Sequence, residues 1–397
     1  MTNRVDLMAP AIRENPYPTY AELRRQAPVC QVDPGGRWVI ARHDDVLTAL
    51  KNSAVFSSMG VGQSSPPAWL GRNHPLADTI LGLDPPRHGP LRALISRAFG
   101  GPATARMEAR IRDFAEELAG KLPGRTVDFV EAFSLALPAR VLCDLMGLDV
   151  ALVTNFKRWA DDVAGIGTIG PDNHARQAQV RTTMTEMEHY LGDVLQSRRH
   201  QPGSDLVSDL VRAEMDGEAL GDTEIMGFLF LLLVAGLETT MHLLSHSIRI
   251  LMDHPDVLAR LRAEPSLIPR FVDEALRFEP PLHGVTRVTT AEVELSGVRL
   301  PARTPVVILL GSACRDEAYF PEPDRFDMDR DGPKNLPFGH STHFCLGARL
   351  ALTEGRLAME ALLPRLTELP RSAGPVEWNA SLAVRGPTKL PLVFQPG

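Results

Sequence analysis

The spacing of apolar residues along the chain predicts mostly helices. Apolar positions recur with a helical period in long stretches, which predict helices at 90–99, 103–121, 175–198, 223–252 and 348–366. Strand-like runs are fewer and fall at 37–42, 286–310 and 382–394. Because these runs come from the beginning, the late middle and the end of the sequence, the strands must pair with each other over long distances. We therefore expect a mainly α fold with a small β-sheet region, organised as a single domain over residues 1–397.

The composition indicates a folded protein that can bury a large hydrophobic core. The 397 residues are 44% hydrophobic and 23% charged, which argues against wholesale disorder. No internal repeat, low-complexity tract or Gly/Ser linker divides the sequence. The formal net charge of −7 argues against nucleic acid as a partner, because phosphate binding needs a basic surface.

The polar N-terminal residues, which do not resemble a signal peptide, and the scattered cysteines favour a cytoplasmic protein without membrane contact. The first 20 residues are polar, are interrupted by prolines and contain no apolar stretch of the kind found in signal peptides. The most apolar run, 225–236, is shorter than the roughly 20 residues that span a bilayer, and it predicts a buried helix. The four cysteines are widely scattered and form no CxxC pair: Cys30, Cys143, Cys314 and Cys345. A disulfide framework or structural zinc site is therefore not expected.

Cys345 has a sequence context that suits chemistry. It lies in the pattern Phe-Gly-x-x-x-His-x-Cys-x-Gly at 338–347, directly before a predicted helix. Unpaired backbone N–H groups and the helix dipole at such a position stabilise a thiolate. Gly339 and Gly347 allow a flat cofactor to approach the backbone closely. The competing interpretation is that a lone cysteine is most often a buried small hydrophobe, but the full pattern is much rarer than its parts.

The segment around Cys345 resembles the haem-ligand loop of the cytochrome P450 family in its soluble bacterial form. The resemblance implies the P450 fold, a haem b cofactor, and the Cys345 thiolate as axial iron ligand, which favours O–O cleavage. It also implies that Phe338 and Gly347 line the haem and that His343 donates to a haem carboxylate. The family usually has glycine where this chain has Ser341, so the loop backbone is the point of departure.

A Glu-x-x-Arg pair gives the resemblance a second, structural element. Glu274 and Arg277 lie three residues apart on a predicted helix, which places them on one face. Alone, such a pair is commonplace on protein surfaces. The family has a buried Glu-x-x-Arg at about this distance before the cysteine, completed by an arginine from a proline-rich segment. Residues 320–326 resemble that segment, and Arg325 is the expected third member.

The hexapeptide 235–240 interrupts the apolar part of the longest predicted helix. Glycine inside a helix costs about 1 kcal/mol relative to alanine, and a glutamate among buried residues costs more unless it is hydrated or paired. One interpretation is that Glu238 simply faces solvent. The sequence Ala-Gly-Leu-Glu-Thr-Thr, however, resembles the oxygen-binding bend of the family. That resemblance implies that Gly236 leaves room for O2 and that Glu238 and Thr239 relay protons.

Further haem contacts follow from the resemblance. The segment 84–92 is similar to the one whose histidine and arginine hold a haem propionate, which implies these roles for His88 and Arg92. Arg287 matches another propionate contact. Taken singly, each is as readily an ordinary surface residue. The resemblance extends over nearly the whole chain, with its motifs in the expected order.

The resemblance implies a mono-oxygenase that inserts one oxygen atom of O2 into a C–H or C=C bond. The chain is too short for fused flavin domains, so a separate ferredoxin or flavoprotein is expected to supply electrons. Basic residues that suit docking of an acidic partner, or that are simply solvated charges, are Arg92, Arg97, Arg349 and Arg356. Family analogy places the substrate pocket along mostly apolar residues, which suit a terpenoid, steroid or polyketide-like molecule: Val234, Ala235, Leu282, His283, Val285, Leu382 and Val384.

Three other functions remain open on the sequence. A peroxide-driven enzyme of the same fold would not need the Glu238–Thr239 pair. An enzyme of this fold that catalyses isomerisation or dehydration would be compatible with every motif. A non-catalytic haem sensor or carrier would need no proton relay, and no signalling domain is appended.

Overall fold

The computed structural model describes residues 4–59, 67–71, 76–77, 79–99, 101–166, 169–215, 217–331 and 336–396. The chain divides into two compact units. The first unit comprises Met1–Ser57, Arg112–Leu135 and Thr239–Gly397, and the second comprises Ser58–Ile111 and Ala136–Glu238. Two of the four chain boundaries between the units fall inside helices, namely α6 (Gly101–Ala119) and α11 (Asp222–Asp253). Each unit is built from segments that alternate along the sequence.

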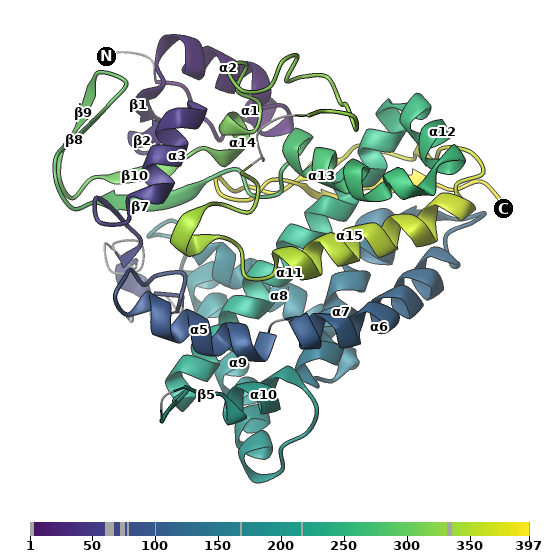
Figure 1. Ribbon diagram of the computed structural model, residues 1–397, viewed down its shortest axis with the longest axis horizontal. Coiled ribbons are helices and arrows are strands. Elements are labelled where there is room, and N and C mark those ends of the chain that lie inside the picture. The colour runs from purple at the N-terminus through teal and green to yellow at the C-terminus, as the bar shows by residue number, and fades with distance from the viewer. Residues whose placement is uncertain are drawn as a thin grey trace. The chain divides into compact units, whose positions relative to one another are not determined.

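The main sheet belongs to the first unit and has the strand order β1-β2-β10-β7-β3. Its strands are β1 (Val29–Val32), β2 (Arg37–Ile40), β3 (Phe56–Ser57), β7 (Val285–Thr289) and β10 (Pro305–Ile308). Strand β2 pairs in parallel with β10, and the other pairs are antiparallel. Figure 1 shows β1, β2, β10 and β7 lying together beside α3 (His43–Lys51). The predicted long-range pairing between the start and the late middle of the sequence is confirmed.

Two central strands of this sheet direct apolar side chains to both of its faces, so that both faces are buried. On β10, Val306 and Ile308 join one apolar cluster, whereas Val307 joins the cluster on the opposite face. On β2, Val39 and Ile40 likewise belong to opposite clusters. Successive side chains of a strand point to opposite faces, so a continuous apolar run is what a sheet covered on both sides requires.

The C-terminal strand pairs elsewhere than predicted. Strand β14 (Pro391–Val393) lies between β11 (Arg371–Ser372) and β4 (Thr126–Asp128) in a separate three-stranded sheet. Two hairpins complete the strands of this unit: β8 (Val293–Leu295) with β9 (Val298–Leu300), and β12 (Glu377–Trp378) with β13 (Pro387–Lys389). The expectation of one shared sheet was therefore wrong for the end of the chain. Apolar periodicity identifies a strand but does not identify its partner.

The helices of the first unit pack around α15 (Ala348–Leu362), which follows the Cys345 loop. Helix α15 contacts α13 (Ile268–Phe278), and Figure 1 shows the two running close together. Gly355 permits a close approach, since a Cβ atom there would lie 3.1 Å from Val272 and 3.3 Å from Leu243 of α11. The remaining α-helices described in this unit are α1 (Pro10–Glu14), α2 (Tyr17–Gln26), α12 (Pro255–Ala263) and α14 (Leu310–Ala313).

The second unit is mainly helical. Its α-helices, apart from the parts of α6 and α11 that it contains, are α5 (His88–Phe99), α7 (Ala136–Met146), α8 (Val153–Ala164), α9 (His174–His200) and α10 (Leu206–Arg212). Strands β5 (Glu214–Met215) and β6 (Glu218–Ala219) form a short hairpin. Side chains cap two of these helices, because Asn173 accepts from the backbone of Arg176 and Asp205 from that of Ser208. The mainly helical prediction is confirmed, and its helix ends lie within a few residues of those observed.

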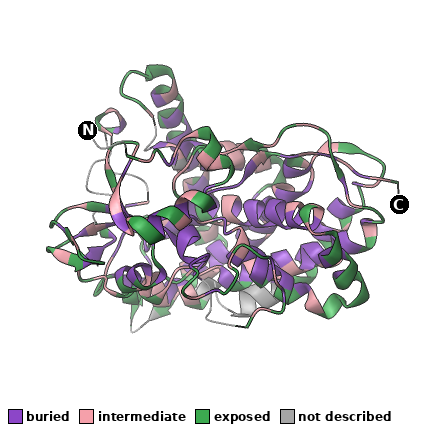
Figure 2. Cartoon of the chain, turned by 90° about the horizontal axis from the view of Figure 1, so that it is seen from above, coloured by how far each residue is buried: buried purple, intermediate pink, exposed green. Residues whose placement is uncertain are grey.

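Helix α11 is the most apolar helix among the described residues. It has 32 residues, so it is long and apolar enough by composition to cross a membrane. However, 67% of its most apolar window is buried within the protein, as in the core helix of a globular protein. The run 225–236 is therefore part of a buried helix that matches the predicted helix at 223–252. Figure 2 shows that buried residues run along the helices while exposed ones occupy loops and outward turns.

Candidate active site

The loop before α15 places Cys345 next to Phe338. The backbone N–H of Cys345 donates to the Phe338 carbonyl at 2.8 Å, which closes the loop. Gly339 turns the chain with a φ of +73°, a conformation that glycine adopts without strain. A short 3-10 turn, η6 (Ser341–His343), follows, and the N–H of Phe344 donates to the Ser341 carbonyl. The hydrogen bonds of this loop thus fix Cys345 at the entrance to the helix.

Ser341 occupies the left-handed region of the backbone map, with a φ of +57°. A side chain there costs roughly 1–2 kcal/mol relative to glycine, because Cβ crowds the following carbonyl. The geometry explains why glycine suits this position in related loops. The loop adopts the turn with serine in place, so the substitution adds strain without changing the path of the chain.

Cys345 differs from the other three cysteines in its surroundings. No disulfide joins any of the four. Burial raises the pKa of Cys143 to about 12 and that of Cys314 to about 11, and it also raises the pKa of Cys30. These three thiols are therefore held protonated. Cys345 is half-buried, as is Cys30, but only Cys345 stands three residues before the first residue of α15, where helix N–H groups favour a thiolate.

The surroundings of Cys345 fit a flat, apolar cofactor. The rings of Phe338 and Phe344 lie 6.2 Å apart in an edge-on arrangement, and Phe344 remains 45% exposed. An aromatic ring left open beside a thiolate is what a stacked macrocycle would cover. His343 and Gly347 are half-buried in the same loop. The His343 donor and the apolar surface formed by Phe338 and Phe344 suit an iron porphyrin that has one protein ligand.

Arg287 lies on β7 in the same unit as the Cys345 loop. Its side chain is 7% exposed, and its guanidinium donates to the Thr286 carbonyl at 2.8 Å. A guanidinium carries five N–H donors and a permanent positive charge, which match a carboxylate. A buried arginine in this unit therefore suits the predicted propionate contact.

His88 and Arg92 are one turn apart on α5 in the second unit. His88 is 1% exposed. Its pKa is lowered mainly by burial and secondly by the positive charge of Arg92. The imidazole is consequently neutral near pH 7 and carries one N–H donor. The structure therefore brings these two predicted residues together.

The middle of α11 is uncovered on one face. Val234 is buried, but Ala235 is exposed, and Gly236, Glu238 and Thr239 are half-buried. Positions 235, 238 and 239 share a helix face by their spacing of three and four. Around Gly236, a Cβ atom would make ordinary contact with Leu142 and Leu232, the nearer at 3.4 Å, so packing within the unit does not require glycine.

Glu238 faces charged groups of α8. Its charge is among the causes that raise the pKa of Asp161, after burial and against the nearby cation Lys157. The Lys157 ammonium pairs with both Asp161 oxygens, at 2.6 and 2.8 Å. The predicted acid therefore lies near other titratable groups, which is the arrangement that proton transfer toward solvent requires.

The two segments predicted to contact substrate are joined by their backbones. The Leu282 and Val384 backbones form an antiparallel bridge, and the N–H groups of His283 and Gly284 both donate to the Ala383 carbonyl. The apolar side chains predicted here are all half-buried: Leu282, Val285, Leu382 and Val384. His283 is instead 2% exposed, and its Nδ1 lies 3.2 Å from the Tyr20 hydroxyl. The polar contact observed for His283 is therefore within the chain.

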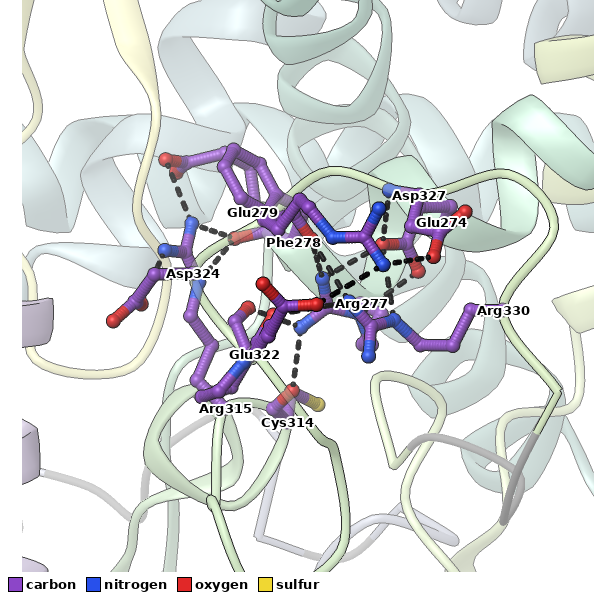
Figure 3. A network of polar contacts seen from close by, with 12 residues as sticks. Glu274, Arg277, Phe278, Glu279, Cys314, Arg315, Glu322, Asp324, Asp327 and Arg330 are labelled. Atoms are coloured by element: carbon purple, nitrogen blue, oxygen red, sulfur yellow. Dashed lines mark hydrogen bonds and ion pairs between the residues drawn. The ribbon is translucent and has the colours of Figure 1, made fainter.

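The Glu274–Arg277 pair is buried, as predicted. Arg277 donates to both Glu274 oxygens at 2.7 and 2.8 Å, and to the Cys314 carbonyl at 3.2 Å. Figure 3 shows these contacts around the Arg277 side chain. Leaving either charge unpaired in this position would cost several kcal/mol.

The third member of this cluster is Arg330 and not Arg325. Arg330 Nε lies 3.4 Å from Glu274 Oε1, and its side chain is 9% exposed. Arg325 contributes only its carbonyl oxygen to Arg277, and its guanidinium pairs with Asp327 at the surface. The prediction chose the arginine inside the proline-rich segment, whereas the chain turns five residues later to bring Arg330 back to Glu274.

A second buried cluster was missed in the sequence. It centres on Glu279, whose carboxylate pairs with Arg385 at 2.5 Å and lies 3.6 Å from Arg315 and 3.9 Å from His246. These residues are up to 139 positions apart, so no local spacing links them. Glu279 directly follows α13, and Arg385 directly follows the predicted substrate residue Val384. Neither position indicates by itself that the side chain forms a buried ion pair.

Comparison with known proteins agrees with this geometry. The family model described as cytochrome P450 matches residues 152–377. The cytochrome P450 mono-oxygenase PikC of Streptomyces venezuelae is 35% identical, covering 96% of this chain and 92% of its own. The 6-deoxyerythronolide B hydroxylase of Saccharopolyspora erythraea is 34% identical over 99% of both chains. The solved structure of CYP109Q5 from Chondromyces apiculatus has a TM-score of 0.91 and 38% identity, covering 100% of both chains.

These relatives confirm the predicted fold and cofactor as well as the type of reaction. The structural match extends over the whole chain, and the named relatives include a mono-oxygenase and a hydroxylase. The residues around Cys345 fit the haem that this family carries. The chain belongs to the cytochrome P450 family, as a mono-oxygenase whose cofactor is haem b.

Proposed function

We propose that this enzyme works in the cytoplasm and inserts one oxygen atom into an apolar, polyketide-type small molecule, using electrons from a separate ferredoxin or flavoprotein. The observation that carries the proposal is the joined pair of segments whose half-buried side chains are all aliphatic: Leu282, Val285, Leu382 and Val384. Aliphatic side chains favour an apolar ligand, because about 25 cal/mol is gained per Å² of apolar surface removed from water. A relative named 6-deoxyerythronolide B hydroxylase, at 34% identity, supports the polyketide class. A vitamin D(3) 25-hydroxylase at 33% identity and CYP109E1 solved with testosterone at 31% identity make a steroid the competing outcome of the test.

In the proposed mechanism Cys345 is the residue that would hold the haem iron. When bound, haem would supply the iron at which O2 is reduced and split. Cys345 would hold that iron as a thiolate, stabilised by the start of α15. Phe338 and Phe344, whose rings lie 6.2 Å apart in this loop, would pack against the cofactor and exclude water from the sulfur. The other thiols keep their protons, so Cys345 is the cysteine suited to the role.

Glu238 and Thr239 move protons on the α11 side of the site. Both are half-buried on the same face of α11, where a carboxylate and a hydroxyl would hold protons for delivery to the reacting centre. The pKa of Asp161 is raised, first by partial desolvation of its carboxylate, while its side chain remains 46% exposed and can exchange protons with water. We assign it, with Lys157, to the route by which Glu238 is reprotonated from solvent.

The haem carboxylates are assigned to four donors. His88 is neutral and provides one N–H group, while Arg92 provides a charged fork on the same helix face. Arg287 and His343 provide the corresponding groups in the first unit. Charge-assisted hydrogen bonds of this kind are roughly twice as strong as neutral ones.

The electron donor is proposed to dock beside Cys345. Arg349 is exposed on the first turn of α15, close in sequence to the exposed ring of Phe344. Arg356 is less suitable, because Glu360 already neutralises it at 2.7 Å. Arg97 keeps its charge but donates to the Glu214 backbone carbonyl, which occupies one of its donors. Of the four arginines expected to dock a partner, Arg349 therefore contributes most.

The substrate proposal is tested with purified holoenzyme. Macrolide polyketide lactones, steroids and terpenoids are titrated separately, and the spin-state shift of the haem spectrum is recorded. The proposal expects the tightest binding and an oxygenated product, with added ferredoxin and reductase, from the polyketide class. Tighter binding and turnover of a steroid or terpenoid would overturn the substrate class. Turnover of any substrate by NAD(P)H and the purified chain alone would overturn the need for a separate donor.

A further inference from the structure

The loop 381–386 is held from several sides by groups that do not themselves belong to the proposed pocket. Within the loop, half-buried Val384 is followed by Arg385, which is 6% exposed, so the two side chains have opposite environments. The N–H of Arg385 donates to the Pro281 carbonyl at 2.8 Å, and its carbonyl lies 3.0 Å from His246 Nε2. The loop is thus connected to α11 as well as to the segment preceding β7.

His246 has a defined tautomer at this contact. A carbonyl oxygen only accepts, so Nε2 must carry the proton and donate to the Arg385 carbonyl. His246 is fully buried, and burial lowers its pKa to about 3, so the ring is neutral under ordinary conditions. Its Nδ1 is then unprotonated and faces Glu279 at 3.9 Å without a hydrogen bond. The ring therefore contributes one directional bond, from α11 to the loop backbone.

The Arg385 side chain fixes the same loop to the N-terminal segment. Its guanidinium donates to the carbonyls of Arg13 at 2.9 Å and Glu14 at 2.5 Å, and it pairs with the Glu279 carboxylate. Burial acts to raise the pKa of Glu279, but Arg385 and the other nearby charges outweigh it, so the pKa falls to about 2. The pair is therefore ionised and inaccessible to most solvent, which makes it costly to separate.

The loop also packs directly against α11 at Gly386. His242, one turn before His246 on α11, lies so close to Gly386 that a Cβ atom there would be 2.1 Å from its ring nitrogen. A side chain at 386 would therefore displace either the ring or the loop. His242 and His246 both contact the part of the chain that immediately follows Leu382 and Val384.

We propose that His246 and Arg385 form a latch that sets the position of the loop 381–386 and so determines which substrates the enzyme accepts. The inference rests on the proposed function, in that Leu382 and Val384 are taken to contact substrate. His246 and Arg385 act through those residues, so they are positioning residues and do not touch substrate. Releasing the latch lets the loop move, and binding a bulky ligand must then order it again.

The test uses the haem-bound enzyme and two ligands of the iron, imidazole and 4-phenylimidazole. Imidazole reports whether the iron is accessible, and the phenyl group of the larger ligand reports the shape of the pocket. In His246→Leu we expect 4-phenylimidazole to bind about threefold to tenfold more weakly, the equivalent of one hydrogen bond, with imidazole unchanged. His246→Gln, which can donate to the Arg385 carbonyl, should restore binding. Equal binding of 4-phenylimidazole by wild type and His246→Leu would overturn the proposal.

Ser247→Ala is the matched control. Ser247 adjoins His246, is 1% exposed, and donates to the Leu243 carbonyl of its own helix at 2.8 Å. It therefore loses a buried hydrogen bond without affecting the loop, and both ligands should bind as in wild type. A Ser247→Ala effect as large as that of His246→Leu would assign the change to general loosening of α11 and contradict the latch.

Two further variants separate this inference from the proposed function. Arg385→Lys keeps a positive charge near Glu279 but loses the forked contacts, and it should weaken 4-phenylimidazole binding in the same way. Val384→Ala changes the pocket wall itself. An effect of Val384→Ala with none from His246→Leu or Arg385→Lys would overturn the latch alone. No effect from Val384→Ala would overturn the proposed pocket.

Discussion

Two regions of the first unit differ in the burial and pairing of their polar side chains. At the end of α13, charged side chains are paired with little exposure to solvent, as in Glu274 with Arg277 and Glu279 with Arg385, where Glu279 is 14% exposed. Around Cys345 and the middle of α11, the polar groups predicted to do chemistry are only half-buried: His343, Cys345 and Thr239. The first region stabilises the fold through interactions that are costly to break. The second keeps its groups accessible to a cofactor and contributes little to stability. Substitutions in the two regions should therefore have different consequences.

Glu274→Ala should have the largest effect on stability. It leaves Arg277 and Arg330 without their carboxylate, and breaking a buried ion pair costs about 3–5 kcal/mol. Chemical denaturation of the haem-bound protein measures this loss.

Arg330→Ala and Arg325→Ala are paired variants for the same cluster. Arg330→Ala should destabilise the protein by more than about 1 kcal/mol, since it removes a charge close to Glu274. Arg325→Ala should change the stability by less, within the range of about 0–1 kcal/mol of exposed pairs, because its side chain is 58% exposed. The reverse order would restore Arg325 as the third member of the cluster.

The pKa of Glu354 is shifted in the opposite direction to that of Glu279. It is 3% exposed on α15, its Oε2 has no hydrogen-bond partner, and burial raises its pKa from 4.5 to about 8. The folded protein therefore binds a proton that the unfolded chain releases. That stabilisation is complete below pH 4.5 and is lost as the pH rises to about 8.

Glu354→Gln should remove this dependence. Between about pH 6.5 and 8, the stability of wild type relative to the variant should fall by up to about 1.4 kcal/mol per pH unit. Denaturant titrations of both proteins across that range measure the difference. Parallel stability curves would contradict a protonated Glu354.

Thr239→Ala should change function more than stability. The side chain is half-buried, and losing one such hydroxyl costs about 1 kcal/mol or less. With added ferredoxin and reductase, NAD(P)H consumption should continue while product falls and peroxide rises, because the Thr239 hydroxyl would no longer hold a proton for delivery to the reacting centre. Thr240→Ala is the control, since Thr240 is the next residue but is 3% exposed. Unchanged coupling in Thr239→Ala, or an equal effect in Thr240→Ala, would remove Thr239 from the relay.

Ser341→Gly should have the smallest effect. Glycine relieves the strain of the positive φ, and the greater freedom of the unfolded chain offsets part of that gain. We expect a stabilisation of no more than about 1 kcal/mol, with haem retained. Loss of haem on purification would show that the Ser341 hydroxyl makes an essential bond.

The comparison also explains what could be predicted from the sequence. Cys345, Glu274 and Arg277 belong to short motifs in which spacing along one helix or loop fixes the geometry, so their local arrangement was predictable. Strand β2 could be expected to pair late in the chain, but apolar alternation could not direct β14 to β4.

Contacts between distant segments could not be predicted. Arg330 was overlooked because its approach to Glu274 depends on a turn, and His246 and Arg385 meet only after three segments have folded together. His283 was expected to contact substrate, yet its observed partner is Tyr20 from the N-terminal helix α2. A single sequence contains no local signal for any of these partners.

The central claim is that Cys345 holds the haem iron as a thiolate. The most direct measurement is the absorption spectrum of the reduced, CO-bound protein for wild type and Cys345→Ser, with Cys314→Ser as control. Wild type and Cys314→Ser should show the red-shifted Soret band of a thiolate-ligated haem, and Cys345→Ser should lose it. A red-shifted band that persists in Cys345→Ser would contradict the account, because another residue would then hold the iron.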